Sequence, residues 1–266
     1  MVLMAILLGT LAAGIGSVWL AALLGFGVLA RYTQHMLSLA AGALLATAFM
    51  HLLPEAFEAG VDAHRLFMAL LAGLVFFFLL DKAELWHHGH EHHHDSNSHH
   101  HQHTHDEPAP IGRPAPLSGT WAVLAGDSVH CFGDGVLIAS AFMANLELGV
   151  LAALAVLAHE IPHHMGDLVV LRSGEGGRQA ALIKVSLAGS VTTLGGLLGY
   201  WLVELLQAYL PYFLVVASSS FVYVALADLI PQLQKRLRAR QTLAQIAWLL
   251  AGIAMVTWVR ALAGGH

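Results

Sequence analysis

Apolar segments of near-membrane length fill most of this chain and restrict what it can fold into. We count eight of them, near residues 3–28, 36–56, 64–81, 120–143, 149–171, 181–206, 212–232 and 242–262. A helix needs about 17–25 mostly apolar residues to cross a bilayer, and backbone in lipid must satisfy its hydrogen bonds internally. Charged residues make up only 11% of the chain, against about 25% in an average soluble protein. The sequence therefore predicts an all-α integral membrane protein of eight transmembrane helices, forming one domain over residues 1–266.

Basic residues fall mainly in alternate loops between these segments. Of the 12 lysines and arginines, only Arg65 and Arg260 lie in one set of loops, and all the others lie in the other set. Cytoplasmic loops carry the excess of lysine and arginine in membrane proteins. The bias predicts that the richer set is cytoplasmic and that both termini lie outside.

Two polar motifs interrupt the apolar segments near 120–143 and 149–171. The first is His130-Cys131-Phe132-Gly133-Asp134-Gly135, and the second is His159-Glu160-Ile161-Pro162-His163-His164. An ionisable side chain at the bilayer centre costs about 2.5–3.5 kcal/mol, so something must stabilise several of them together. Imidazole and carboxylate are ligands for divalent cations, and the motifs therefore predict a metal site within the membrane.

Helical spacing shows which of these side chains share a face. Residues three or four apart lie on one face of a helix, so His130 stacks with Asp134 and His159 stacks with His163. These four residues are the predicted principal ligands of one cation held between the two helices.

A second stripe of polar residues lies one position further round each helix. It consists of Asp127 with Cys131, and Glu160 with His164. Asp134 and His163 are spaced to face both stripes and to bridge two adjacent metals. Asp167 continues the His163 face by one turn, and Asp127 and Asp167 are predicted to line the release path toward the cytoplasm.

A histidine-rich segment separates the third and fourth apolar segments. From His87 to His105, 11 of the 19 residues are histidine, interleaved with acidic and small polar residues. Such a run has no apolar side chains to bury. We expect residues 82–119 to form a disordered cytoplasmic loop that captures or senses metal; the alternatives are an expression tag or a merely solubilising linker.

The two motifs resemble the fourth- and fifth-helix signatures of the ZIP family of divalent-metal transporters, which usually read H-N-F-x-D-G and H-E-I-P-H-E-x-G-D. The sequence His51-Leu52-Leu53-Pro54-Glu55 extends the resemblance, which covers essentially the whole chain. It implies a 3+2+3 arrangement of helices with inverted repeats around the metal-bearing pair. The compactness of the chain suggests a prokaryotic member of the family, located in a bacterial cytoplasmic (inner) membrane.

The resemblance also assigns the ligands. It implies His130, Asp134, His159 and His163 for the principal transport site. It implies Cys131 and Glu160 for a second site, with Asp134 and His163 bridging the two. Cys131 stands where the family usually has Asn, and His164 stands where many relatives have Glu. The sixth segment carries no carboxylate between Glu175 and Glu204, so its acidic ligand is missing.

A weak internal repeat agrees with an inverted-repeat transporter. Residues 50–55 resemble residues 227–232, and the two sequences lie in the middle helix of the first and last triplets. Inverted repeats that flank a midplane site are common in alternating-access transporters. His51 and Glu55 on the outside and Asp228 on the inside are therefore candidates for the ion path, or are merely helix-end residues in water.

These observations predict transport of a divalent cation toward the cytoplasm by alternating access. Zn²⁺ is the first candidate cargo, with Fe²⁺, Mn²⁺ or Cd²⁺ as others, and no catalytic cofactor or nucleic acid is expected. The expected partners are metal ions, the bilayer and a second copy of the chain in a homodimer. Three alternatives stay open: an intramembrane zinc protease using the H-E-x-x-H pattern at 159–163, a cation exporter and a sealed metal sensor.

Overall fold

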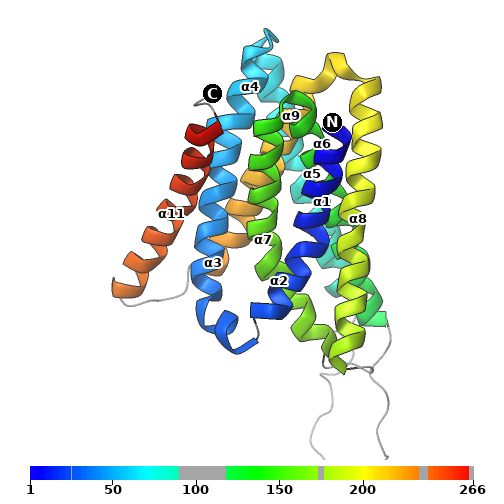
Figure 1. Ribbon diagram of the computed structural model, residues 1–266, viewed down its shortest axis with the longest axis vertical. Helices are drawn as coiled ribbons and strands as arrows, with labels where there is room; N and C mark the ends of the chain where they lie inside the picture. The colour runs from blue at the N-terminus through cyan, green and yellow to red at the C-terminus, as the bar shows by residue number, and fades with distance from the viewer. Residues whose placement is uncertain (25, 90–117, 173–176, 234–238, 264–266) are drawn as a thin grey trace, which may run out of the picture.

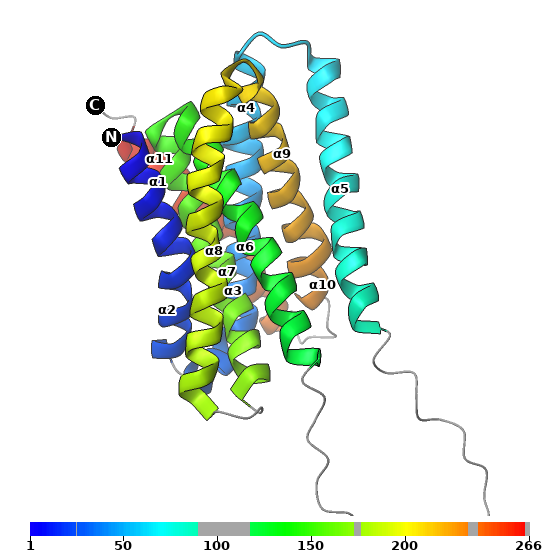
Figure 2. The same ribbon diagram turned by 90° about the vertical axis from the view of Figure 1, so that its right-hand side faces the viewer.

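The computed structural model describes residues 1–24, 26–89, 118–172, 177–233 and 239–263 of the chain (Figures 1 and 2). Every regular element in these ranges is a helix, and they contain no strand. The prediction of an all-α protein is confirmed. The long helices run side by side with alternating direction, and α1 begins at the same end of the bundle at which α11 ends (Figure 1).

The helices follow the apolar segments closely. In chain order they are α1 (Val2–Leu11), η1 (Ala12–Gly16), α2 (Ser17–Leu24), α3 (Phe26–Thr47), η2 (Ala48–Leu52), α4 (Leu53–Glu58), α5 (Ala63–Gly89), α6 (Ser118–Ala144), α7 (Leu146–Arg172), α8 (Gly177–Leu205), η3 (Gln207–Tyr209), α9 (Leu210–Tyr223), η4 (Val224–Leu229), α10 (Ile230–Leu233) and α11 (Ala239–Ala263). The segments η1, η2 and η4 are π-helical turns within longer helices, and η3 is a 3₁₀ turn.

Seven helical stretches within the described ranges are long and apolar enough to cross a membrane. The helix α6 is not among them, and the side chains of residues 118–123 at its start lie outside the described residues that this criterion covers. Helix α6 runs alongside the others, in contact with α7, α8 and α9. Seven candidate spans are thus found, and the predicted count of eight is not confirmed by this criterion.

Helices extend into both ends of the range 82–119, which the sequence predicts to be a loop. Helix α5 continues to Gly89, and residues 82–85 within this extension are good helix formers, while α6 already begins at Ser118. Residues 90–117, which hold nine of the 11 histidines between His87 and His105, lie outside the described residues.

The motif-bearing helix α6 is packed most extensively against α8. Glycines make this close crossing possible, because a Cβ atom added at Gly135 would meet the backbone of Thr192. A Cβ atom at Gly195 would likewise meet the backbone carbonyl of Phe132. Small residues let helix backbones approach in membranes, so α8 closes one side of the metal-bearing helix.

Two pairs of peripheral helices are arranged alike. Helix α5 packs on α9, and α11 packs on α3, while α3 and α9 also contact each other nearer the centre. If α3 is exchanged with α9 and α5 with α11, the contact between α5 and α9 becomes the contact between α11 and α3, and the reverse also holds. This is the packing that an inverted repeat would produce.

The same two inner helices carry matching irregular turns. In η2, the N–H of Leu53 donates to the carbonyl of Ala48, five residues back. In η4, the N–H of Ile230 donates to the carbonyl of Ala225, also five residues back. The next residue is proline in both helices, and proline has no N–H with which to continue the regular ladder. The weak sequence repeat therefore coincides with a repeated backbone irregularity.

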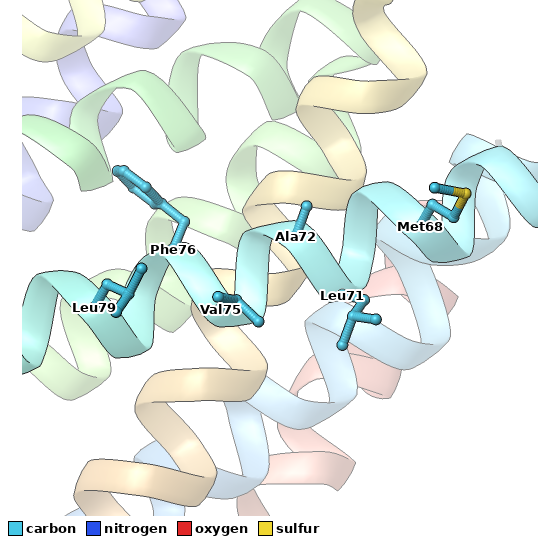
Figure 3. A pocket seen from close by; sticks show the side chains of 6 residues that line it. All are labelled: Met68, Leu71, Ala72, Val75, Phe76 and Leu79. Atoms are coloured by element: carbon cyan, nitrogen blue, oxygen red, sulfur yellow. The ribbon is translucent and has the colours of Figure 1, made fainter.

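Helix α5 stands at the edge of the bundle (Figure 2). An apolar groove runs along it, lined by Met68, Leu71, Ala72, Val75, Phe76 and Leu79 (Figure 3). Lipid tails are as apolar as leucine, so this surface suits contact with the bilayer interior.

Candidate metal centre

The two motifs face each other because α6 and α7 run antiparallel from a tight turn. The side-chain oxygen of Asn145 accepts a hydrogen bond from the N–H of Leu148 at 2.8 Å and caps the start of α7. Helix α7 continues through Pro162 without ending. As a consequence, Asp134 on α6 lies beside His159 on α7. Asp127 lies beside His163, and this second pair is one to two helical turns nearer to the end of the bundle at which α6 begins.

Four side chains form what we call the first group: His130, Asp134, His159 and Glu160. Nε2 of His159 lies 3.3 Å from Nε2 of His130 and 3.3 Å from Oδ2 of Asp134. Oε1 of Glu160 lies 3.1 Å from Nε2 of His159 and 3.3 Å from Nε2 of His130. Nε2 of His130 lies 3.9 Å from Oδ2 of Asp134.

These separations match the edges of a metal coordination tetrahedron. Ligand atoms about 2.1 Å from a Zn²⁺ ion lie about 3.4 Å from one another when the geometry is tetrahedral. Nδ1 of His159 lies 3.4 Å from the carbonyl oxygen of Ala155, which can only accept, so Nδ1 carries the hydrogen. The lone pair of Nε2 then faces the group, which is the tautomer that a metal ligand requires.

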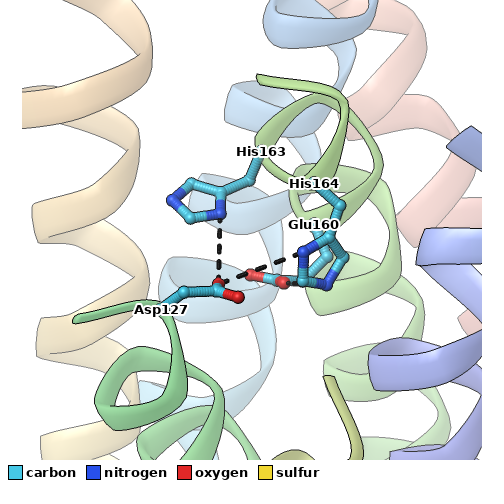
Figure 4. Close-up of side chains that lie close together, drawn as sticks. All are labelled: Asp127, Glu160, His163 and His164. Atoms are coloured by element: carbon cyan, nitrogen blue, oxygen red, sulfur yellow. Dashed lines mark ion pairs between the residues drawn. The ribbon is translucent and has the colours of Figure 1, made fainter. Parts of the chain in front are cut away.

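The second group consists of Asp127, Glu160, His163 and His164 (Figure 4). Oδ1 of Asp127 lies 3.6 Å from Nδ1 of His163 and 4.0 Å from Nδ1 of His164. Nε2 of His164 lies 2.9 Å from Oε2 of Glu160. The ligand atoms are therefore close enough to converge on a cation, in a more open arrangement than in the first group.

Glu160 belongs to both groups through its two oxygens. Oε1 faces the first group and Oε2 faces the second. The spacing of the motifs predicts that Asp134 and His163 bridge two sites and that His163 groups with His130. In the structure the ligand atoms of Asp134 converge with the first group and those of His163 with the second, while the rings of His130 and His163 lie 5.4 Å apart. Glu160 reaches both levels because it follows His159 directly and has one methylene more than an aspartate.

Two further predicted residues border the second group. Oδ2 of Asp167 lies 3.4 Å from Nδ1 of His163 and 3.7 Å from Nδ1 of His164. The buried thiol of Cys131 donates to Oδ1 of Asp127 at 3.7 Å and to Oε2 of Glu160 at 3.9 Å. Neither side chain is part of the two converging sets. Asp127, predicted to lie on the second stripe and to line the release path, is a member of the second group.

Several buried polar atoms of these residues lack a hydrogen-bonding partner among the described residues. Their neighbours lie at ion-pair distance, outside the angles of a hydrogen bond. The atoms are Oδ2 of Asp127, Oδ2 of Asp134, Oε1 of Glu160, Nδ1 of His163, both ring nitrogens of His164 and Oδ2 of Asp167. Buried polar atoms are nearly always satisfied, and a cation is a partner that carboxylate and imidazole donors could share.

Access to the two groups differs from residue to residue. The side chain of His163 is 38% exposed and that of His130 is 28% exposed, whereas Asp134 and His159 are each only 3% exposed. The two exposed imidazoles are thus the points at which an ion would first meet or last leave the groups.

The remaining predicted residues lie on helices other than α6 and α7. His51 is buried on η2, and Glu55 is half-buried on α4, at the end of the bundle that holds the start of α1 (Figure 1). Asp228 belongs to η4, and its side chain lies outside the described residues. Among the described side chains, neither His51 nor Glu55 belongs to the converging sets.

Comparison with known proteins gives consistent similarities. The sequence profile of a family described as ZIP Zinc transporter matches residues 1–111 and 82–260. The human zinc transporter ZIP4 is 28% identical over 259 residues, which cover 79% of this chain and 40% of that protein. The zinc transporter ZIP13 of Pongo abelii is 29% identical, covering 94% of this chain and 76% of its own. The Drosophila melanogaster zinc transporter foi is 31% identical, covering 51% of this chain and 19% of its own. The chain thus spans about two fifths of ZIP4 and about three quarters of ZIP13.

Proposed function

This chain belongs to the ZIP zinc transporter family, and on that premise we propose that it carries divalent cations across a membrane toward the cytoplasm. Zinc is the first candidate cargo, since the relatives ZIP4, ZIP13 and foi are named zinc transporters. Fe²⁺, Mn²⁺ and Cd²⁺ are the other candidates. The metal is cargo in this proposal, and no catalytic cofactor is needed.

One observation carries the proposal: two ligand groups lie in succession along α6 and α7 and share Glu160. A purely structural metal site is closed and holds its ion with a single complete ligand set. Two consecutive sets with an exposed imidazole in each suit an ion that enters one set and leaves from the other. Asp167, beside the second group, would receive the ion toward the cytoplasm.

We propose eight membrane-crossing helices in a 3+2+3 order, with α6 counted as a crossing helix. The alternating helix directions, the paired contacts of α5 with α9 and α3 with α11, and the matching turns η2 and η4 support two inverted triplets around α6 and α7. His51 and Glu55 would then lie at the outer approach and Asp228 at the inner exit. The loop charges support outward termini in a bacterial inner membrane, with a homodimer as a further expectation.

The protease alternative does not fit the ligand arrangement. In an H-E-x-x-H protease both histidines bind one zinc ion and the glutamate acts as base. Here His159 belongs to the first group, His163 belongs to the second, and Glu160 is a member of both. The family of the chain is likewise one of transporters rather than enzymes.

The test is uptake of radioactive zinc into liposomes that contain the purified protein. We expect saturable uptake by the wild type and its loss in Asp134→Asn, which removes one charge from the first group. His64→Gln, on the exposed start of α5, is the matched control and should transport normally. If the protein binds zinc, iron, manganese or cadmium tightly but transports none of them, a sealed sensor is favoured. If metal moves only out of loaded vesicles in which the cytoplasmic loops of the protein face the vesicle interior, an exporter is favoured.

A further inference from the structure

We propose that the outer face of α5 fits a bilayer thinner than average, so that phospholipids with short acyl chains are its partner. The inference concerns the surface that α5 presents to lipid. It rests on the chain being an integral membrane protein and does not depend on the cargo.

Helix α5 faces lipid along most of its length. Only 11% of its most apolar stretch is buried, against 72% for the stretch Tyr32–Glu58. Among the described helices it packs extensively only on α9. The side chains along its outer groove, from Met68 to Leu79, are all apolar (Figure 3). The length of its apolar run is therefore matched directly against the thickness of the surrounding bilayer.

This apolar run is short. The 15 residues from Leu66 to Leu80 are all apolar, and they lie between the charged residues Arg65 and Asp81. At about 1.5 Å per residue the run is about 22 Å long, against about 30 Å for the hydrocarbon core of a typical bilayer. Tilting α5 would shorten its reach across the membrane further.

Two other helices with large exposed apolar surfaces are longer between their charges. On α8, 19 uncharged residues separate Lys184 from Glu204, and on α11 the same number separates Arg240 from Arg260. Each of these runs is about 28 Å long. The mismatch with an average bilayer is therefore concentrated at the edge of the bundle where α5 stands (Figure 2).

The charges at the C-terminal end of the run do not extend away from it. Side chains on a helix lean toward its N-terminus, so Lys82 leans back over the apolar run. Its Nζ lies 5.7 Å from the centre of the Phe78 ring, one turn inside the run. Asp81 has a short side chain, and its Oδ2 accepts a hydrogen bond from the hydroxyl of Tyr223 on α9 at 3.0 Å. Neither group is free to reach distant headgroups, as a snorkelling side chain would.

A bilayer of average thickness must therefore either cover charged groups of α5 or become thinner beside it. Burying a charge in hydrocarbon costs more than compressing the lipid around one helix by a few ångströms. We expect the bilayer to thin beside α5. Lipids with short acyl chains meet α5 without compression and should stabilise the folded protein.

The experiment places the purified full chain in vesicles of monounsaturated phosphatidylcholines, with acyl chains of fourteen to twenty-two carbons in steps of two. The midpoint of thermal unfolding is followed by the fluorescence of the six tryptophans. Asp81→Leu combined with Lys82→Leu lengthens the apolar run to 18 residues, or about 27 Å. Tyr223→Phe removes only the hydrogen bond to Asp81, and Lys184→Leu lengthens the run of α8 instead, so both serve as matched controls.

We expect the wild-type midpoint to be highest with fourteen- or sixteen-carbon chains and to fall toward twenty-two carbons. The optimum of the double variant should move to longer chains by at least one step of the series. Tyr223→Phe should lower the midpoint in every lipid without moving the optimum, and Lys184→Leu should leave the optimum in place.

The proposal is overturned if the wild-type optimum lies at eighteen carbons or longer, or if the double variant keeps the wild-type optimum. A midpoint that is independent of chain length, together with a dimeric mass in light scattering, would show that a second copy covers α5 and would also overturn it. If the double variant does not fold, the wild-type series decides alone. Unfolding rather than transport is measured, so failure of the proposed function does not affect the outcome.

Discussion

Replacing Glu160 by glutamine removes one negative charge from both ligand groups at once. Oε1 lies 3.1 Å from Nε2 of His159 in the first group, and Oε2 lies 2.9 Å from Nε2 of His164 in the second. Glutamine keeps the length of the side chain but offers a single neutral oxygen, which can serve only one group at a time. The substitution therefore weakens both groups, whereas any other single ligand change weakens one.

The size of the effect follows from the number of groups affected. Loss of a partner behind a metal ligand already costs about 10- to 100-fold in metal affinity, or about 1.4–2.8 kcal/mol. Loss of a charged ligand costs at least as much in each group. If the two effects are independent, Glu160→Gln lowers the product of the two affinities by about 10²- to 10⁴-fold. Asp134→Asn and Asp127→Asn should each lower only one affinity.

Titration calorimetry of the purified protein with zinc measures these affinities, and liposome uptake measures their consequence for transport. Asp134→Asn is the comparison for the first group and Asp127→Asn for the second, since each residue belongs to one group only. A role of Glu160 in both groups is refuted if Glu160→Gln weakens zinc binding no more than Asp134→Asn does. It is also refuted if one group keeps its wild-type affinity in Glu160→Gln.

Further expectations concern single residues and one segment. His159→Ala should abolish zinc uptake, because it removes the nitrogen nearest to the other first-group ligands; residual saturable uptake would contradict this. Cys131→Ser should change zinc uptake less than about twofold, since the thiol lies outside both converging sets; a tenfold loss of uptake would indicate that the thiol binds the metal. Gly135→Ala should lower the free energy of unfolding in detergent by about 1–3 kcal/mol through overpacking against α8, whereas Gly133→Ala, with open space around it, should not. Deletion of residues 87–105 should leave substantial zinc uptake. Complete loss of uptake would indicate that the essential metal site lies outside the membrane helices.

Much of the fold was predictable because lipid restricts the chain to apolar helices. The ligand types and the two helices that carry them were also predictable, since ionisable side chains in these segments need a partner. The helix α6 shows both requirements together: it carries Asp127 and Asp134 and still forms one continuous helix from Ser118 to Ala144.

The division of ligands between the two groups was not predictable from spacing. Helical periodicity places His159 and His163 on one face, but it does not fix the height at which α6 faces α7. The antiparallel packing brings Nδ1 of His163 to 3.6 Å from Oδ1 of Asp127, while its ring lies 5.4 Å from that of His130 without joining the first converging set. Side-chain length then decides that Glu160 lies between the groups, a property that the pattern of residue types does not encode.

The shared carboxylate also bears on how fast an ion passes. Because Glu160 presents one oxygen to each group, a transported ion can keep one contact with the protein while its other ligands are exchanged. It does not need to regain its water shell between the two positions. Dehydration and rehydration then occur only before the first contact with the protein and after the last one, and these end steps would limit turnover.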